Sequence, residues 1–271
     1  MALHSRDLDV RTTPSWWQHV WTIARFTLLE GARTRLAWTI ALTLVTLAVA
    51  SFLVERIAIA DSARVRMVFL ASTCRFAVVA LLCQYIIASV MRELNDAAVQ
   101  FALALPTPGS AIYIGKLAAF CVMSLVVATL TGAAAIGAAD AQRIATWCAL
   151  LFGELSLMAG VALFCALGTR QFLLATLLCG SVYLLARGIA GFEQLTASRL
   201  RPDDGAFAQV GSIAVQLLGS VLPDLSRFAR AEWLADTAAA PSDLGAAAMQ
   251  TAITLVLTAA AGIHDLKRRG M

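Results

Sequence analysis

The stretch from Arg92 to Lys116, RELNDAAVQFALALPTPGSAIYIGK, is a polar-led interruption between two long apolar runs. Its first half predicts a short helix, because four apolar residues recur at helical spacing on one stripe: Leu94, Ala98, Phe101 and Leu105. Pro106 and Pro108 then end the helix, since neither ring nitrogen can donate a hydrogen bond. We therefore expect a rigid helix over about residues 93–105, held between two membrane spans and able to receive force. A solvated loop with some helical content is the alternative.

The composition indicates an all-α integral membrane protein. Of the 271 residues, 60% are hydrophobic and only 14% are charged, which is too little charge to cover a soluble globule of this size. Six apolar runs approach the roughly 20 residues that a helix needs to cross the hydrocarbon core. These runs predict six spans, at residues 36–54, 67–91, 110–139, 144–169, 172–192 and 244–263.

The chain before the first span divides into a polar tail, residues 1–14, and an amphipathic segment, residues 15–35. Several apolar or small side chains share one face of this segment: Trp17, Val20, Trp21, Ala24, Leu28 and Gly31. Three tryptophans in six residues fit the headgroup region, so we expect an interfacial helix lying along the membrane. Phe26 and Leu29 fall on its polar side. No repeat is evident, and we treat residues 15–271 as a single domain.

A long hydrophilic insertion, residues 193–243, separates the fifth and sixth spans. Within it, AFAQVGSIAVQLLGSVLP, residues 206–223, predicts an amphipathic helix that lies on or dips into the outer face of the membrane. Because residues 206–222 carry no charge, a seventh span is the competing interpretation.

Lys and Arg counts in the short loops predict the orientation. The side that holds the N-terminus has eleven and the other side has eight, and the contrast is sharpest at the last span, which Lys267, Arg268 and Arg269 follow. We therefore expect both termini and the 93–105 helix in the cytoplasm, with the protein in the inner membrane.

Several kinds of chemistry have no signal in the sequence. The basic residues are scattered, which argues against nucleic acid, and the six cysteines lie inside apolar runs without CxxC spacing. None of the three histidines lies in a predicted span, so a metal site is not expected. Gly109 to Lys116 superficially resembles a phosphate-binding loop, but the glycine spacing is wrong and Leu117 replaces the Ser or Thr. We expect no catalytic residue and no cofactor bound by this chain.

Three ionisable residues lie inside predicted spans, namely Arg75, Glu154 and Arg187. A charge in lipid needs a partner, a watery cavity or a route to the interface. Arg75 and Glu154 lie at matching depths, roughly 12 and 15 Å from the outer ends of their spans at about 1.5 Å per residue, which predicts a buried ion pair. This pair is either a structural pin or part of a substrate path. Arg187 is close enough to its span's outer end to snorkel there.

Taken together, this pattern resembles the permease subunits of type 2 ATP-binding cassette (ABC) transporters of the small half-transporter kind. The residues that carry the resemblance are Arg92-Glu93, the helix after it, Leu105-Pro106, Gly115-Lys116, Leu222-Pro223-Asp224-Leu225 and the basic tail from Asp265 to Arg269. The resemblance implies a homodimer of permeases in the lipid bilayer, each bound to a separate ABC ATPase subunit that holds the ATP and magnesium.

In such a complex the 93–105 segment would be the coupling helix and the 15–35 segment the elbow helix. The resemblance implies that Arg92, Glu93, Leu94, Asp96, Phe101 and Leu105 contact the ATPase, and that the complex is an exporter. Two other classes stay open: a gradient-driven secondary transporter or channel that uses Arg75 and Glu154, and a membrane anchor or assembly factor.

Overall fold

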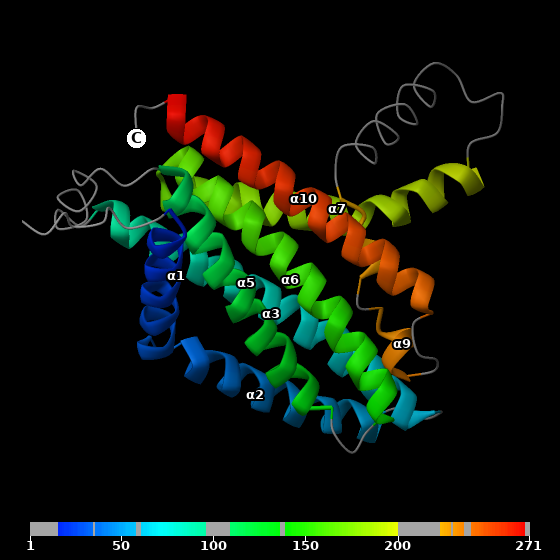
Figure 1. Ribbon diagram of the computed structural model, residues 1–271. Helices are drawn as coiled ribbons and strands as arrows, with labels where there is room; N and C mark the ends of the chain where they lie inside the picture. Colours follow the sequence, from blue (N-terminus) through cyan, green and yellow to red (C-terminus); the bar gives the residue numbers. More distant parts are fainter. Residues whose placement is uncertain are drawn as a thin grey trace, which may run out of the picture.

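The computed structural model describes residues 16–34, 36–57, 61–95, 109–135, 139–199, 223–228, 230–235 and 240–268, and its regular elements are helices (Figure 1). The long helices are α1 (Trp16–Arg33), α2 (Leu36–Ile57), α3 (Ser62–Asn95), α5 (Gly109–Ala133), α6 (Ala141–Thr169), α7 (Phe172–Arg199) and α10 (Pro241–Arg268). Two short helices, η1 (Leu225–Arg227) and α9 (Glu232–Ala235), lie between α7 and α10.

Within the described ranges, five helices are long and apolar enough to cross a membrane: α2, α3, α5, α6 and α10. The chain is therefore an all-helical, multi-pass membrane protein, as its composition predicts. The fifth predicted span falls on α7, whose apolar part is the shorter stretch Phe172–Gly188. The helix of the third predicted span ends at Ala133, before the predicted residue 139, and a turn follows it.

Helix α6 is the centre of the bundle. Ten consecutive residues, 154–163, are buried, which requires neighbours on every side of the helix. Those neighbours are α3, α5, α7 and α10. The α6–α7 connection is short because Arg170 takes a left-handed backbone conformation, with φ at 52°, and its N–H bonds the Ala166 carbonyl. α6 and α7, on which the fourth and fifth predicted spans fall, therefore pack as neighbours.

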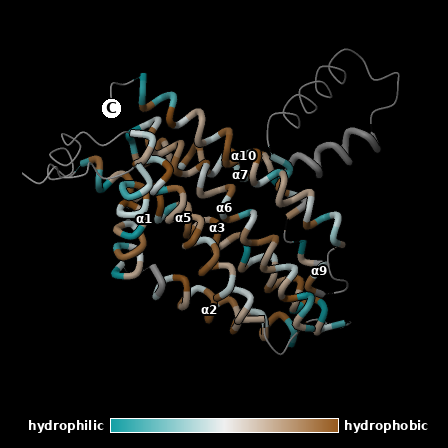
Figure 2. The backbone as a smooth tube through the Cα atoms, viewed as in Figure 1, coloured by the Kyte–Doolittle hydropathy of each residue, from teal (hydrophilic) through white to brown (hydrophobic). Residues whose placement is uncertain are grey.

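The outermost long helices present apolar surface away from the bundle. α2 packs mainly on α3, and its outward side chains are large and exposed, among them Trp38, Leu42, Val49 and Phe52. α10 packs on α6 and α5 and likewise exposes Met249, Val256 and Leu257. Figure 2 shows apolar colour over much of these helices and hydrophilic colour toward their ends. Such a surface fits contact with lipid chains.

α1 crosses the ends of the bundle and packs on α5 (Figure 1). Val20, Ala24, Thr27 and Gly31 are buried in that contact, whereas Trp17 and Trp21 are exposed. The single apolar face expected from the sequence is therefore split between a protein contact and an exposed aromatic edge. Phe26 and Leu29, which fall on the polar side, are exposed as well.

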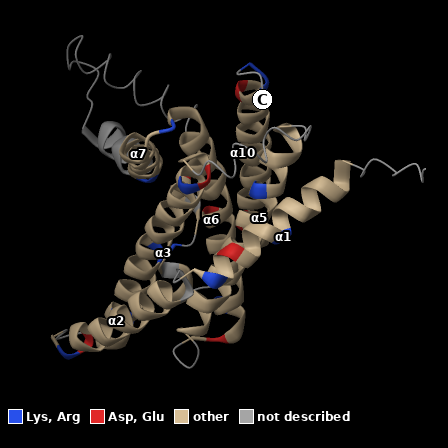
Figure 3. Cartoon of the chain, turned by 90° about the vertical axis from the view of Figure 1, so that its left-hand side faces the viewer, with Lys and Arg blue, Asp and Glu red and all other residues tan. Residues whose placement is uncertain are grey.

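We name the two ends of the bundle by the elements found there. The α1 end holds α1, the last turns of α3, α6 and α10 and the start of α5, and the α9 end holds η1, α9 and the opposite helix ends. Figure 3 shows that charged residues gather mostly toward these two ends, with few along the middle.

Some predicted elements lie outside the described residues. These are the tail 1–14, the amphipathic helix of residues 206–222 with much of the 193–243 insertion, and residues 96–105 of the expected coupling helix. Asp96, Phe101 and Leu105 are in the last of these ranges. Arg92, Glu93 and Leu94 are described, and they form the last turn of α3, which runs unbroken to Asn95.

Candidate functional site

The three intramembrane charges converge on one point. Glu154, on α6, is fully buried, and its Oε2 lies 4.0 Å from Arg75 Nε on α3. Its Oε1 lies 3.5 Å from Arg187 Nη1 on α7 and accepts a hydrogen bond of 3.2 Å from Tyr183 Oη. One carboxylate therefore joins three helices, and two guanidinium groups offset the cost of burying it.

Both arginines also donate to backbone carbonyls of the segment before α10. Arg187 Nη1 donates to the Leu225 carbonyl at 2.7 Å, and Arg75 Nη1 donates to the Phe228 carbonyl at 3.3 Å. A guanidinium has five N–H groups in a rigid fork, so each arginine can face a carboxylate and a carbonyl together. We call Arg75, Glu154, Tyr183 and Arg187 the charge cluster.

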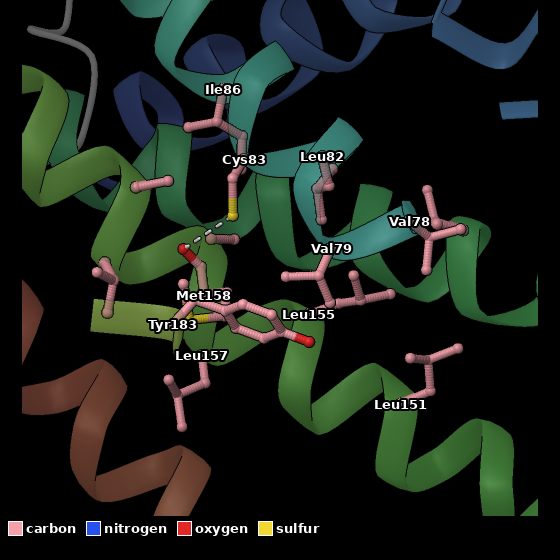
Figure 4. Packing of buried hydrophobic residues seen from close by; sticks show 14 of the residues in the cluster. Val78, Val79, Leu82, Cys83, Ile86, Leu151, Leu155, Leu157, Met158 and Tyr183 are labelled. Carbon is pink, nitrogen blue, oxygen red and sulfur yellow. Dashed lines mark hydrogen bonds between the residues drawn. The ribbon is translucent and has the colours of Figure 1, made fainter. Parts of the chain in front are cut away.

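Apolar side chains surround the Tyr183 member of the charge cluster. Figure 4 shows Tyr183 among buried residues of α3 and α6, including Val79, Leu155 and Met158. In the same layer Cys83 Sγ contacts the Met158 carbonyl at 3.9 Å. This packing holds the Tyr183 ring in place and fixes where its hydroxyl reaches Glu154.

The sequence predicts part of this arrangement. Arg75 and Glu154 lie together, as their matching depths predict. The prediction that Arg187 snorkels outward is wrong, because its guanidinium turns inward to Glu154 and the Leu225 carbonyl. Tyr183 was missed, although it lies four residues before Arg187, a spacing that places both side chains on one face of a helix.

A second group of charges joins three helices at the α1 end. Arg92 Nη2 lies 3.0 Å from Glu30 Oε1, which ties α3 to α1. Lys116 and Glu93 form an ion pair that ties α5 to α3. Lys116 is nearly buried, with 8% of its side chain exposed, whereas Arg92 is 54% exposed. We call Glu30, Arg92, Glu93 and Lys116 the corner pairs.

Two cavities in the described part of the chain lie near these groups. One, of about 160 Å³, lies between α3, α6 and α7; Tyr183 is among its lining residues and Glu154 is not. The other, of about 70 Å³, lies at the α1 end and is lined by Glu93, Lys116 and Arg170 together with apolar side chains. The first is almost entirely apolar, which suits a lipid chain or side chain better than a hydrated ion.

No group of three or more His, Cys, Asp or Glu side chains that could hold a metal ion occurs among the described residues. The six cysteines are free. With the geometry in view, a comparison with protein-family models finds no match to this sequence, and a search of curated proteins finds no significantly similar one.

Proposed function

We propose that this chain is the membrane-spanning permease subunit of an ABC exporter. It works as a dimer, and each copy binds a separate ATPase subunit through residues 92–105. ATP is hydrolysed on the ATPase, and the permease passes substrate across the inner membrane by alternating access. The observation that carries this proposal is the set of corner pairs, because they bind α1, α3 and α5 together where the predicted coupling segment begins and ends.

Residues 96–108 connect Asn95 to Gly109, so the segment is attached at both ends to helices of the bundle. The Lys116–Glu93 pair links those two helices close to the attachment points, and Arg92–Glu30 adds α1. A force applied to the segment would therefore reach all three helices as one unit.

α3 supplies the path from this corner into the membrane. It has 34 residues without a break, which is about 51 Å of helix at 1.5 Å per residue. Arg92 lies at its α1 end and Arg75 about 26 Å further along the same rod. A displacement of the Arg92 end of α3 by the ATPase would thus also displace Arg75 in the charge cluster.

The other two classes have less support. A gradient-driven carrier would need Glu154 to exchange an ion with water, but its side chain is fully buried and faces two arginines and Tyr183. A membrane anchor or assembly factor has no need to transmit force, so that function would not account for the corner pairs or for the continuous α3.

The test is co-purification in mild detergent followed by an ATPase assay of the complex in liposomes. We expect a stoichiometric ABC ATPase to stay bound to the tagged protein, and we expect Glu93→Ala with Phe101→Ala to abolish both binding and permease-stimulated hydrolysis. The matched control is Glu55→Gln, which removes an ion pair with Arg66 near the α9 end, 2.7 Å long, and should leave both intact. A purified dimer that binds no ATPase would overturn the proposal.

A further inference from the structure

The segment before α10 is packed inside the bundle. Leu225, Phe228 and Leu234 are 0%, 0% and 1% exposed, and the segment contacts α3, α6 and α7. Figure 1 shows α9 against the helices at the α9 end. We call residues 223–228 the plug.

The plug has little regular structure of its own to satisfy its backbone. Within it, Asp224 Oδ1 accepts hydrogen bonds from Ser226 N and Ser226 Oγ, at 3.0 and 2.5 Å, which stiffens the turn. The Leu225 carbonyl accepts a 3.2 Å hydrogen bond from Phe228 N within the plug and a second one from Arg187, whereas the Phe228 carbonyl accepts from Arg75. A buried carbonyl that loses its donor is costly, so these two contacts hold the plug in place.

We propose that the plug is a latched element that closes the α9-end half of the bundle, and that Glu154 is the positioning residue of the latch. Glu154 touches no atom of the plug in the contacts described above. It acts through the two arginines, because its two oxygens face Arg75 and Arg187 and direct the remaining N–H groups toward the plug.

In the hydrogen bonds of the latch, the long helices supply the charged groups and the plug supplies neutral ones. In the contacts between the charge cluster and the plug, the charged groups lie on α3, α6 and α7, and the plug contributes the carbonyls of Leu225 and Phe228. Breaking these two contacts separates no pair of opposite charges, which would be the expensive step in a membrane. This inference does not depend on the ATPase proposal, since any protein with this cluster would have the same latch.

Shape adds to the polar contacts. Gly153, next to Glu154, lies against the Phe228 ring, and a Cβ there would be 3.1 Å from Phe228 Cε1. The absence of a side chain at Gly153 thus leaves the recess that receives Phe228. Gly153, which precedes Glu154, and the ring of Phe228, whose carbonyl Arg75 contacts, are therefore complementary in shape.

The test is hydrogen–deuterium exchange, read by mass spectrometry, on the full chain in detergent micelles. Two variants loosen the latch in different ways. Glu154→Gln removes the charge that orients the arginines, and Arg75→Lys keeps the positive charge but loses the fork that reaches both partners. We expect amides of residues 225–235 to exchange about tenfold faster in both variants, and to be accelerated more than the amides of α5 and α10.

The matched control is Asp140→Asn, which removes an exposed carboxylate from its 3.0 Å ion pair with Arg143 and should leave exchange in residues 225–235 unchanged. A purely structural ion pair would be retained in Arg75→Lys, so normal exchange of residues 225–235 in that variant would overturn the latch. Equal acceleration of every helix in Glu154→Gln would overturn it too, because the carboxylate would then hold the whole fold rather than the plug. Arg187→Lys, which also keeps its charge, serves as a second latch variant if Glu154→Gln does not fold.

Discussion

The backbone of Gly115 on α5 lies so close to α1 that an added Cβ would stand 2.9 Å from the carbonyl oxygen of Val20. The Cβ of Ile23 would be only 3.0 Å away. Since the nearest atom belongs to the backbone of α1, a side chain at residue 115 could be admitted only by moving the whole helix. The close packing of α1 on α5 thus depends on glycine at residue 115.

We therefore expect Gly115→Ala to lower the thermal stability of the purified protein, at a cost of about 1–3 kcal/mol for overpacking. Melting temperature followed by fluorescence-detected size exclusion measures the effect. Gly180→Ala is the control, because a Cβ at Gly180 meets nothing within 4 Å. Equal melting temperatures for the two variants would contradict the close approach of α1 and α5.

Gly153→Ala should destabilise the protein by pressing on the Phe228 ring and on Thr251 Oγ1, each 3.1 Å from the added Cβ. Phe228→Leu, made together with Gly153→Ala, should recover part of the loss, because the smaller side chain gives space back. A double-mutant cycle measures the coupling. Strictly additive effects would mean that the two residues do not touch.

Glu154→Gln should be among the most damaging single changes, at about 3–5 kcal/mol, because it leaves the buried Arg75 and the half-buried Arg187 without their counter-charge. Glu154→Gln with Arg187→Gln should be less destabilised than the two single changes added together, since the double variant restores the original net charge of the cluster. Chemical unfolding of the three variants provides the comparison, and a double variant as unstable as the sum would contradict the shared carboxylate.

Exchanging the charges of Arg75 and Glu154 should not restore stability. Matching depths alone predict rescue by Arg75→Glu with Glu154→Arg, but the guanidinium introduced by the second change would face Arg187 at the place of the present 3.5 Å contact. Expression and monodispersity of the double variant against each single one provide the check. Full rescue would show that Arg187 does not approach residue 154.

Glu93→Gln should destabilise the α1 end more than Arg92→Ala does. Lys116 is 8% exposed at its side chain, so losing Glu93 leaves a nearly buried ammonium group, whereas Arg92 is half in solvent and its pair is worth about 1 kcal/mol at most. Adding Lys116→Met to Glu93→Gln should return most of the stability. Thermal unfolding of the three variants and the unaltered protein tests the order.

The sequence predicts the membrane-crossing helices well because their signal is local. A run such as residues 36–54 has no charge over its whole length. Because the bilayer core holds no water to bond its N–H and C=O groups, such a run must form a helix that bonds them internally. The contact between Arg75 and Glu154 is also predictable, since each charge is costly in lipid and the depths match. The spans and this contact are predictable because the cost of placing each residue in lipid depends only on its type and its position along the helix.

The inward turn of Arg187 could not be predicted in this way. Its acceptor is the Leu225 carbonyl, 38 residues later in the chain. Backbone carbonyls carry no sequence signal, and the prediction that Arg187 snorkels considered only its own helix. The extension of α3 to Asn95 has a similar cause, because Glu93 and Lys116 stabilise that last turn through a partner on α5. Long-range partners therefore decided the details of the candidate site.

The burial of α6 on all sides also bears on how the chain is made. Of its neighbours, α3 and α5 are synthesised before it, and α7 and α10 after it. When α6 leaves the ribosome, Arg75 is already in the membrane to meet Glu154, but Arg187 and the plug do not yet exist. Folding of the bundle thus waits for its last helix, and chains that stop short of α10 are expected to be recognised and degraded by membrane quality control.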